Sequence, residues 1–255
     1  IAGRTLIRET YLAKSDPISE EIQNKLREWT EFTTRQINEK PSYNRYVKIE
    51  ELIVCCDAST TAWAASIYTF NNNSLTDGTQ SNEKFHLVCS RGGLVKPTWT
   101  VPRAELHALV EAIKTLQKLP PEYTQNKTIV VATDNEPNVH RLRNLGNDKH
   151  LKGFEKTRVQ WIRKTLTEMK VTSKKRIYIR TIPGSANPAD DATRPWPLAT
   201  APFSNWKDLT MALLMINPYK YEPEEIHEDY VQYMTLRSHT NHPESLNQAV
   251  KPKEI

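Results

Sequence analysis

The strongest constraint on the fold is a short apolar run, LIVCCDA at 52–58, which is followed after only three residues by a second run, AWAASIYTF at 62–70. A nearly continuous apolar segment of this length is typical of a strand buried in the middle of a sheet. The short spacer favours a second strand that folds back against the first as an antiparallel neighbour. We therefore expect a hairpin in the core, with Asp57 at the end of its first strand.

The remaining patterns alternate between strands and helices. We expect three more strands, at 84–91, 127–133 and 176–182. We also expect helices at 101–119, from about 136 and at 154–169, and a loop at 119–123, where the sequence is LPPEY. Three strands followed by alternating helices and strands fold most simply into a five-stranded mixed sheet flanked by helices. The predicted fold class is α/β.

Composition suggests one main domain with extensions at both ends. We expect an N-terminal helical segment at 1–48, a main α/β domain at 49–195 and an irregular C-terminal extension at 196–255. Apolar residues recur at helical spacing before residue 37, and NWKDLTMALLMI at 205–216 favours one more helix before a flexible, acidic tail. Because the first residue is Ile1, we expect a fragment or processing product of a longer chain.

The charge pattern favours a polyanionic partner for the middle of the chain. The formal net charge is +5, and the stretch 141–180 holds 13 Lys and Arg against three acids, although a solvated helix face would give the same pattern. No run of residues is long and apolar enough for a membrane span, and no secretory leader is visible. Cys55, Cys56 and Cys89 lie in apolar runs, as buried thiols of a reducing compartment do, so we expect an intracellular protein.

Four acids stand where a sheet of this order can bring them to one edge. Asp57 ends the first strand, Glu105 lies in the first turns of the first helix of the domain, Asp134 ends the fourth strand, and Asp190 follows the fifth. Four clustered carboxylates repel one another unless cations neutralise them. Oxygen ligands without nearby His or Cys favour Mg²⁺, with Mn²⁺ possible, and a pair of such ions supports phosphodiester hydrolysis.

Each acid also has an ordinary structural explanation when it is taken alone. Asp57 suits a turn at a strand end, Glu105 suits the positive end of a helix dipole, and Asp134 and Asp190 suit helix caps. The metal-site interpretation requires only one common cause, whereas the ordinary explanation requires four separate ones. We therefore favour a metal site made by all four acids.

Several motifs, in order, carry a resemblance to a known family. CDASTTAWAASIY, SRGGLVKPTWTVPRAELHAL, ATDNEPNVHRL, FEKTRVQWIRK and IPGSANPADDATR resemble the ribonuclease H domain of BEL/Pao-type LTR retrotransposon polyproteins. The upstream AKSDPISEEIQNKLREWTEF resembles the connection that joins this domain to the reverse transcriptase. The resemblance implies a ribonuclease H-like fold and a metal-dependent endoribonuclease that hydrolyses the RNA strand of RNA–DNA hybrids.

The resemblance also implies a role for each acid. Asp57 would bridge two Mg²⁺ ions, Asp190 would share the ion beside the attacking water, and Glu105 and Asp134 would hold the ion beside the leaving 3′ oxygen. Asp191 would be a solvated neighbour or would support the metal ligands from behind. The sequence departs from the family pattern in two places, and both lead us to expect slower turnover or altered metal use. No histidine occurs between residues 150 and 227, where relatives often carry a mobile one, and an asparagine at 135 replaces the usual serine.

Two other functions fit parts of the pattern. A degenerate or domesticated domain would keep the fold and serve nucleic-acid binding or protein assembly. An integrase or a proofreading exonuclease would share the fold, but the exonucleases carry a glutamate two residues after the first aspartate, where this chain has Ser59. The resemblance implies an RNA–DNA hybrid and an upstream polymerase domain as partners, in a cytoplasmic virus-like particle or the nucleus. The oligomeric state and the role of 196–255 stay open.

Overall fold

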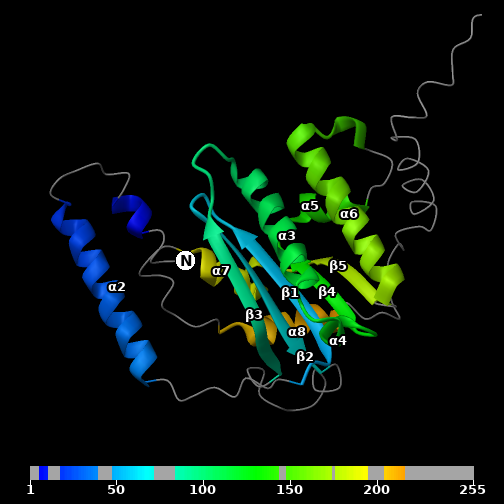
Figure 1. Cartoon of the computed structure of the whole chain (residues 1–255), viewed down its shortest axis with the longest axis horizontal. Helices are drawn as coiled ribbons and strands as arrows, with labels where there is room; N and C mark the ends of the chain where they lie inside the picture. The colour runs from blue at the N-terminus through cyan, green and yellow to red at the C-terminus, as the bar shows by residue number, and fades with distance from the viewer. Residues whose placement is uncertain are drawn as a thin grey trace, which may run out of the picture.

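The computed structural model of the chain describes residues 6–10, 18–39, 48–71, 84–143, 148–173, 176–194 and 204–215. Within these ranges the chain forms one five-stranded sheet with helices on both faces (Figure 1). This confirms the predicted α/β fold. None of the described helices has the length and apolar character needed to cross a membrane. The expected acidic tail lies outside the described residues.

The sheet is mixed because of the order in which its strands join. Its five strands are β1 (Glu51–Ala58), β2 (Ala62–Phe70), β3 (Phe85–Leu94), β4 (Thr128–Thr133) and β5 (Arg176–Thr181). The spatial order is β3-β2-β1-β4-β5; β2 runs antiparallel to both β1 and β3, whereas β4 is parallel to both β1 and β5. The predicted hairpin and all five predicted strands are confirmed. The central strand β1 ends beside β4, its parallel neighbour.

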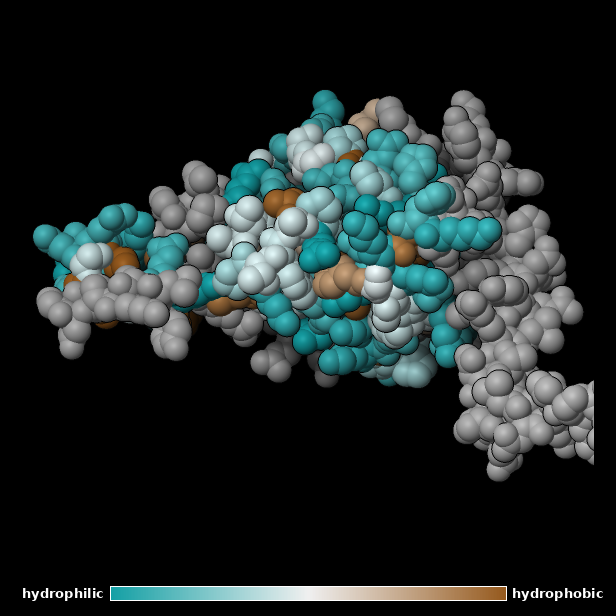
Figure 2. All heavy atoms as spheres, turned by 90° about the horizontal axis from the view of Figure 1, so that it is seen from above, coloured by the Kyte–Doolittle hydropathy of each residue, from teal (hydrophilic) through white to brown (hydrophobic). Residues whose placement is uncertain are grey.

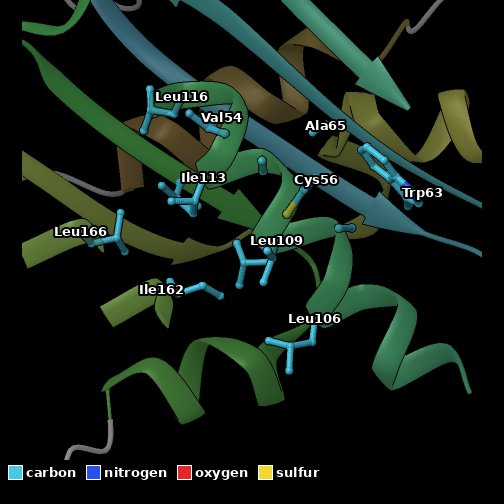
Figure 3. Close-up of a cluster of buried hydrophobic side chains, with 14 of the residues drawn as sticks. Val54, Cys56, Trp63, Ala65, Leu106, Leu109, Ile113, Leu116, Ile162 and Leu166 are labelled. Atoms are coloured by element: carbon cyan, nitrogen blue, oxygen red, sulfur yellow. The ribbon is translucent and has the colours of Figure 1, made fainter. Parts of the chain in front are cut away.

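One face of the sheet carries the larger apolar core. It is covered by α3 (Val101–Gln117) and α6 (Gly153–Ser173), with α5 (Glu136–Arg143) and the 3-10 turn η3 (Asp148–His150) between β4 and α6. Figure 3 shows leucines of α3 beside β1 and side chains of α6. The labelled buried side chains include Val54, Cys56, Leu106, Leu109, Ile113, Ile162 and Leu166. Because this core holds α3 against β1, it fixes where the first turns of α3 meet the strand ends.

The opposite face is covered by two shorter helices, α7 (Pro188–Thr193) and α8 (Trp206–Met215). Ile53 and Cys55 of β1 point to this face, where Leu209 and Leu213 of α8 are also buried. The predicted helix near 205–216 is therefore confirmed. The loop predicted at 119–123 is wrong in part, because α4 (Pro121–Thr124) forms there with proline at its first position, where no amide hydrogen is needed.

The predicted N-terminal helix is present as α2 (Glu20–Glu39), but none of its residues is buried. Figures 1 and 2 show it to one side of the sheet domain, with hydrophobic residues among hydrophilic ones on its surface. Ile37, for example, is 72% exposed. The described part of the chain therefore offers α2 no core to pack into.

The cysteines behave largely as predicted. Cys55 and Cys56 are fully buried, whereas Cys89 is only partly buried, and all three are free thiols. Burial raises the pKa of each of these thiols. Thiols in this state are poor nucleophiles, so we regard them as part of the apolar packing.

Candidate active site

The ends of β1 and β4 bring two of the predicted acids together. Cys55 pairs with Ala132 in the parallel register, and Asp57 and Asp134 each lie two residues further along their strands. They therefore occupy equivalent positions at the same edge of the sheet. Parallel strands end at a common edge, so their last side chains can share one site.

The third acid comes from the covering helix. Proline at the start of α3 suits the first turn, and Glu105 follows one turn later, above the end of β1. Carboxylate oxygens of Asp57, Glu105 and Asp134 all lie within 4.8 Å of one another. The structure thus brings these three predicted acids into one group, which we call the three-acid cluster.

The electrostatics of the three-acid cluster are those of crowded, desolvated carboxylates. Burial, followed by repulsion from Asp57 and Asp134, raises the pKa of Glu105 to about 8. Burial also raises the pKa of Asp57 to about 6, and repulsion from Asp134 and Asp190 adds to this rise. The pKa of Asp134 is raised as well, again chiefly by burial. The cluster holds charge only at an energetic cost, which a cation would remove.

Two residues that the sequence analysis did not single out hold the cluster in place. The Thr193 hydroxyl donates to the Asp57 carboxylate over 2.6 Å, in a buried position. The Asn187 amide donates to the Cys56 carbonyl at 3.1 Å and to Asp134 at 3.4 Å, while its own oxygen accepts from the Ala189 amide at 3.1 Å. Asn187 therefore starts α7 and also joins the ends of β1 and β4. The asparagine before a proline in NPAD was the available signal for the cap, but not for the contacts with the strands.

Asp190 lies near the three-acid cluster but does not belong to it. Its carboxylate is ion-paired with Arg194, with 2.6 Å between Oδ2 and Nη2, and the same guanidinium lies 3.2 Å from Asp191. The negative charge of Asp190 nevertheless contributes to the raised pKa values of Asp57 and Glu105. Asp190 is therefore close enough to influence the cluster, and its carboxylate is already partly neutralised.

The three-acid cluster fits a divalent cation. The Glu105 Oε2 atom is buried and has no hydrogen-bond partner. Among the described residues, no lysine, arginine or histidine forms an ion pair with Asp57, Glu105 or Asp134. Three anionic oxygen donors without a protein counter-charge are the ligands that Mg²⁺ and Mn²⁺ prefer. These residues could therefore hold such an ion.

Hydrogen bonds near the three-acid cluster show which side chains cap helix α5 and stabilise the β1–β2 turn. Asp134 is not the cap of α5, because the Asn135 side chain accepts from the Asn138 amide at 3.0 Å. Ser59 stabilises the β1–β2 turn, since its hydroxyl accepts from the Ala62 amide at 3.1 Å. It also donates to the Thr193 carbonyl at 3.2 Å and so ties the β1–β2 turn to α7.

His107 has a structural role. Its ring lies edge-on between Trp63 and Trp99, with centroid distances of 5.5 and 4.9 Å. Trp99 also contacts Phe154 on α6, at 5.4 Å. The four rings therefore connect the sheet to both helices of the larger core.

The family comparison agrees with this arrangement. A family model described as the Pao retrotransposon-like RNaseH-like domain matches residues 5–135. The matched span contains all three members of the three-acid cluster and ends before Asp190. No curated protein matches the sequence.

Several solved structures resemble the chain distantly. LC11-RNase H1 in complex with an RNA/DNA hybrid is 15% identical, with a TM-score of 0.38, over 54% of this chain and 88% of that one. RNase H1 from the halophilic archaeon Halobacterium salinarum is 13% identical, with a TM-score of 0.36, over 57% of this chain and 94% of that one. The foamy viral protease-reverse transcriptase in complex with dsDNA is 13% identical, with a TM-score of 0.34, over 69% and 34%.

Proposed function

Since this chain belongs to the Pao retrotransposon-like RNaseH-like domain family, we propose that it is a metal-dependent endoribonuclease that hydrolyses the RNA strand of RNA–DNA hybrids. The observation that carries this proposal is the three-acid cluster, in which carboxylates from β1, α3 and the end of β4 lie within 4.8 Å of one another. The family supports the class of substrate, and the three-acid cluster supports the position of the metal-dependent reaction.

Asp57, Glu105 and Asp134 would hold divalent metal in this proposal, and Asp190 would complete the site. Two bound Mg²⁺ ions would supply Lewis-acid stabilisation of the departing oxygen and a nucleophilic water for phosphodiester hydrolysis. Asp57 would have the central role, which is supported by its low exposure of 5%, its hydrogen bond from Thr193 of α7 and its proximity to Glu105 and Asp134. Mn²⁺ would be an alternative ion, because it accepts the same oxygen ligands.

Thr193 and Asn187 would act as positioning residues. The hydroxyl of Thr193 fixes one oxygen of Asp57, and the amide of Asn187 fixes one oxygen of Asp134. Each of these contacts engages a single oxygen of its carboxylate. Carboxylates held in this way need less reorganisation when a cation binds.

The substrate and the setting follow from the same proposal. Selection of the RNA strand would require the site to sense 2′-hydroxyl groups across a wide minor groove. The segment that contains α2 would connect the nuclease to a preceding polymerase domain, and the exposed Ile37 of α2 supports such a partner. The compartment we propose is intracellular, either a cytoplasmic particle or the nucleus.

Cleavage of a hybrid with a labelled RNA strand tests the proposal. Wild type should cut the RNA only when Mg²⁺ or Mn²⁺ is present, and Asp57→Asn should remove at least about 10³-fold of the rate, since metal assistance contributes several kcal/mol. Asp191→Asn is the matched control, because it removes one nearby carboxylate that lies outside the three-acid cluster. Equal cleavage by wild type and Asp57→Asn would exclude the assigned site.

A measurement of metal binding separates a weak enzyme from a wrong assignment. Calorimetric titration with Mg²⁺ should give uptake by wild type and markedly weaker uptake by Asp57→Asn. Hybrid binding and Mg²⁺ uptake without cleavage would identify a binding module that has lost its chemistry. Absence of Mg²⁺ uptake by wild type would remove the basis of the proposal.

A further inference from the structure

Two arginines converge on one backbone oxygen at the β5 edge of the sheet. Nη2 of Arg143, at the end of α5, donates to the carbonyl oxygen of Ile179 at 2.9 Å. Nη1 of Arg180, on β5, donates to the same oxygen at 3.3 Å. Two guanidinium groups therefore lie next to one another around a single acceptor. We call them the arginine pair.

No described residue neutralises the arginine pair. Among the described residues, neither Arg143 nor Arg180 forms an ion pair with an acid. Nη2 of Arg180 is buried and has no hydrogen-bond partner. Burial, followed by repulsion from Arg143, lowers the pKa of Arg180. Two adjacent positive charges without a described acidic partner, one of them on the exposed Arg143, would be stabilised by an anion.

The arginine pair is close to the three-acid cluster. Arg180 pairs with Ala132 on β4, and Asp134 lies two residues beyond Ala132. With standard strand spacing and rise, the Cα atoms of Arg180 and Asp134 are separated by roughly 8 Å. Arg180 also lies over the ring of Tyr178, with 5.6 Å to the centroid, and Tyr178 packs against the apolar cluster on the α7 face. The arginine pair thus lies at β5, the strand next to β4, whose end carries Asp134.

We infer that Arg143 and Arg180 bind one backbone phosphate of the nucleic-acid strand whose adjacent phosphodiester lies at the three-acid cluster. This inference rests on the proposed function and adds a site for the strand to it. Guanidinium groups present planar sets of donors that match phosphate oxygens, so two of them can hold one phosphate from two sides. An anion there would also remove the repulsion between the two arginines.

The site would orient the strand along the sheet edge. A phosphate held at β5 and a phosphodiester at the end of β1 and β4 fix two points on one strand, and two fixed points define its direction. Phosphate contacts of this kind set register without reading the base sequence. The arginine pair would thus position the cleaved bond without restricting which sequence is cleaved.

The salt dependence of hybrid binding tests the inference. Fluorescence anisotropy of a labelled RNA–DNA hybrid in EDTA reports binding without cleavage, and its slope against log salt counts phosphate contacts. Arg143→Gln and Arg180→Gln should each reduce the magnitude of the slope by about one. Arg143→Lys should keep most of the slope, because the positive charge is retained. Lys118→Gln is the matched control, since Lys118 is exposed just beyond the far end of α3.

The possible outcomes separate this inference from the proposed function. Slopes of both glutamine variants equal to that of Lys118→Gln would overturn the inference even if wild type cleaves the hybrid. Reduced slopes together with absence of Mg²⁺-dependent cleavage would overturn the proposed chemistry and leave the phosphate site standing. Because Arg180 is partly buried, its variant could unfold, and the exposed Arg143 then decides the result, with circular dichroism confirming its fold.

Discussion

The three-acid cluster and the acid pair of α7 lie side by side, but they differ in whether a basic side chain compensates their negative charge. Asp57, Glu105 and Asp134 are crowded and desolvated, and no described basic residue pairs with them. Asp190 and Asp191 are more exposed, and one guanidinium, that of Arg194, pairs with both. The first group has no basic partner among the described residues, whereas the second shares one positive charge between its two carboxylates.

This difference indicates where an external cation contributes most. A carboxylate that already has an arginine gains little from a second positive charge, because exposed ion pairs are worth about 1 kcal/mol or less. A buried carboxylate without a partner gains much more, because its desolvation is not compensated. The effect of removing a charged side chain should therefore decrease from the three-acid cluster to Asp190 and then to Arg194.

The largest effect should come from Glu105→Gln. This change removes a carboxylate whose buried Oε2 atom has no protein partner, so the loss should be at least about 10³-fold in the rate of Mg²⁺-dependent cleavage. Single-turnover cleavage of the labelled hybrid, at saturating Mg²⁺, measures it. A loss below tenfold would show that the cluster is not where metal acts.

Asp190→Asn should have an intermediate effect, and it tests most directly the difference between the three-acid cluster and the acid pair of α7. Because Arg194 already neutralises part of the Asp190 charge, we expect a loss of about 10²-fold, with a higher Mg²⁺ concentration needed for half-maximal rate. A Mg²⁺ titration of the cleavage rate measures both quantities. A loss equal to that of Glu105→Gln would mean that Arg194 releases Asp190 when metal binds.

The stability of the metal-free protein should fall as pH rises from about 4.5 to about 8. The pKa of Glu105 is raised from its ordinary 4.5 to about 8, and that of Asp57 from 3.8 to about 6, so the folded state binds more protons than the unfolded state in this window. Stability from these groups is complete below the lower values and is lost as the carboxylates ionise. We expect a loss on the order of 2 kcal/mol, about 30-fold in the unfolding equilibrium.

Urea unfolding in EDTA at several pH values measures this loss, and Glu105→Gln provides the internal check. The variant has no carboxylate to ionise at that position, so its stability should vary less over the same pH range. Addition of Mg²⁺ should flatten the wild-type profile, because a ligand that binds only the folded state adds to its stability. A wild-type stability that rises between pH 5 and 8 would contradict the raised pKa values.

The smallest effect should come from Arg194→Gln. Removal of the guanidinium frees Asp190 from its ion pair, so the Mg²⁺ concentration for half-maximal cleavage should fall by about two- to threefold while the maximal rate stays within the same range. The same Mg²⁺ titration measures it, with Arg194→Lys as the charge-preserving control. A tenfold or greater loss of maximal rate would mean that Arg194 does more than balance the acids.

Sequence reasoning predicted the elements that rest on local pattern. The apolar runs of β1 and β2 and the helical spacing of apolar residues in α3 reflect burial, and these patterns can be recognised from the order of the residues alone. The positions of Asp57 and Asp134 followed because both residues come at strand ends. Proline near the start of α3 likewise indicated where the first turn of the helix lies, and this predicted the position of Glu105.

The contacts that depend on three-dimensional packing were not predictable in the same way. Thr193 and Asp57 are separated by 136 residues, and nothing in either local sequence indicates that they share a hydrogen bond. The pairing of Asp190 with Arg194 has helical spacing, but its effect on the cluster depends on where α7 docks. The arginine pair likewise exists only because α5 packs beside β5.

The two contacts that α7 makes with the acids have a consequence for synthesis of the protein. A nascent chain that has left the ribosome only as far as β5 possesses every strand of the sheet, yet it lacks both Asn187 and Thr193. Its carboxylates then lack the hydrogen bonds from α7. The side chains of Asp57 and Asp134 are therefore held in place only after residue 193 has also left the ribosome.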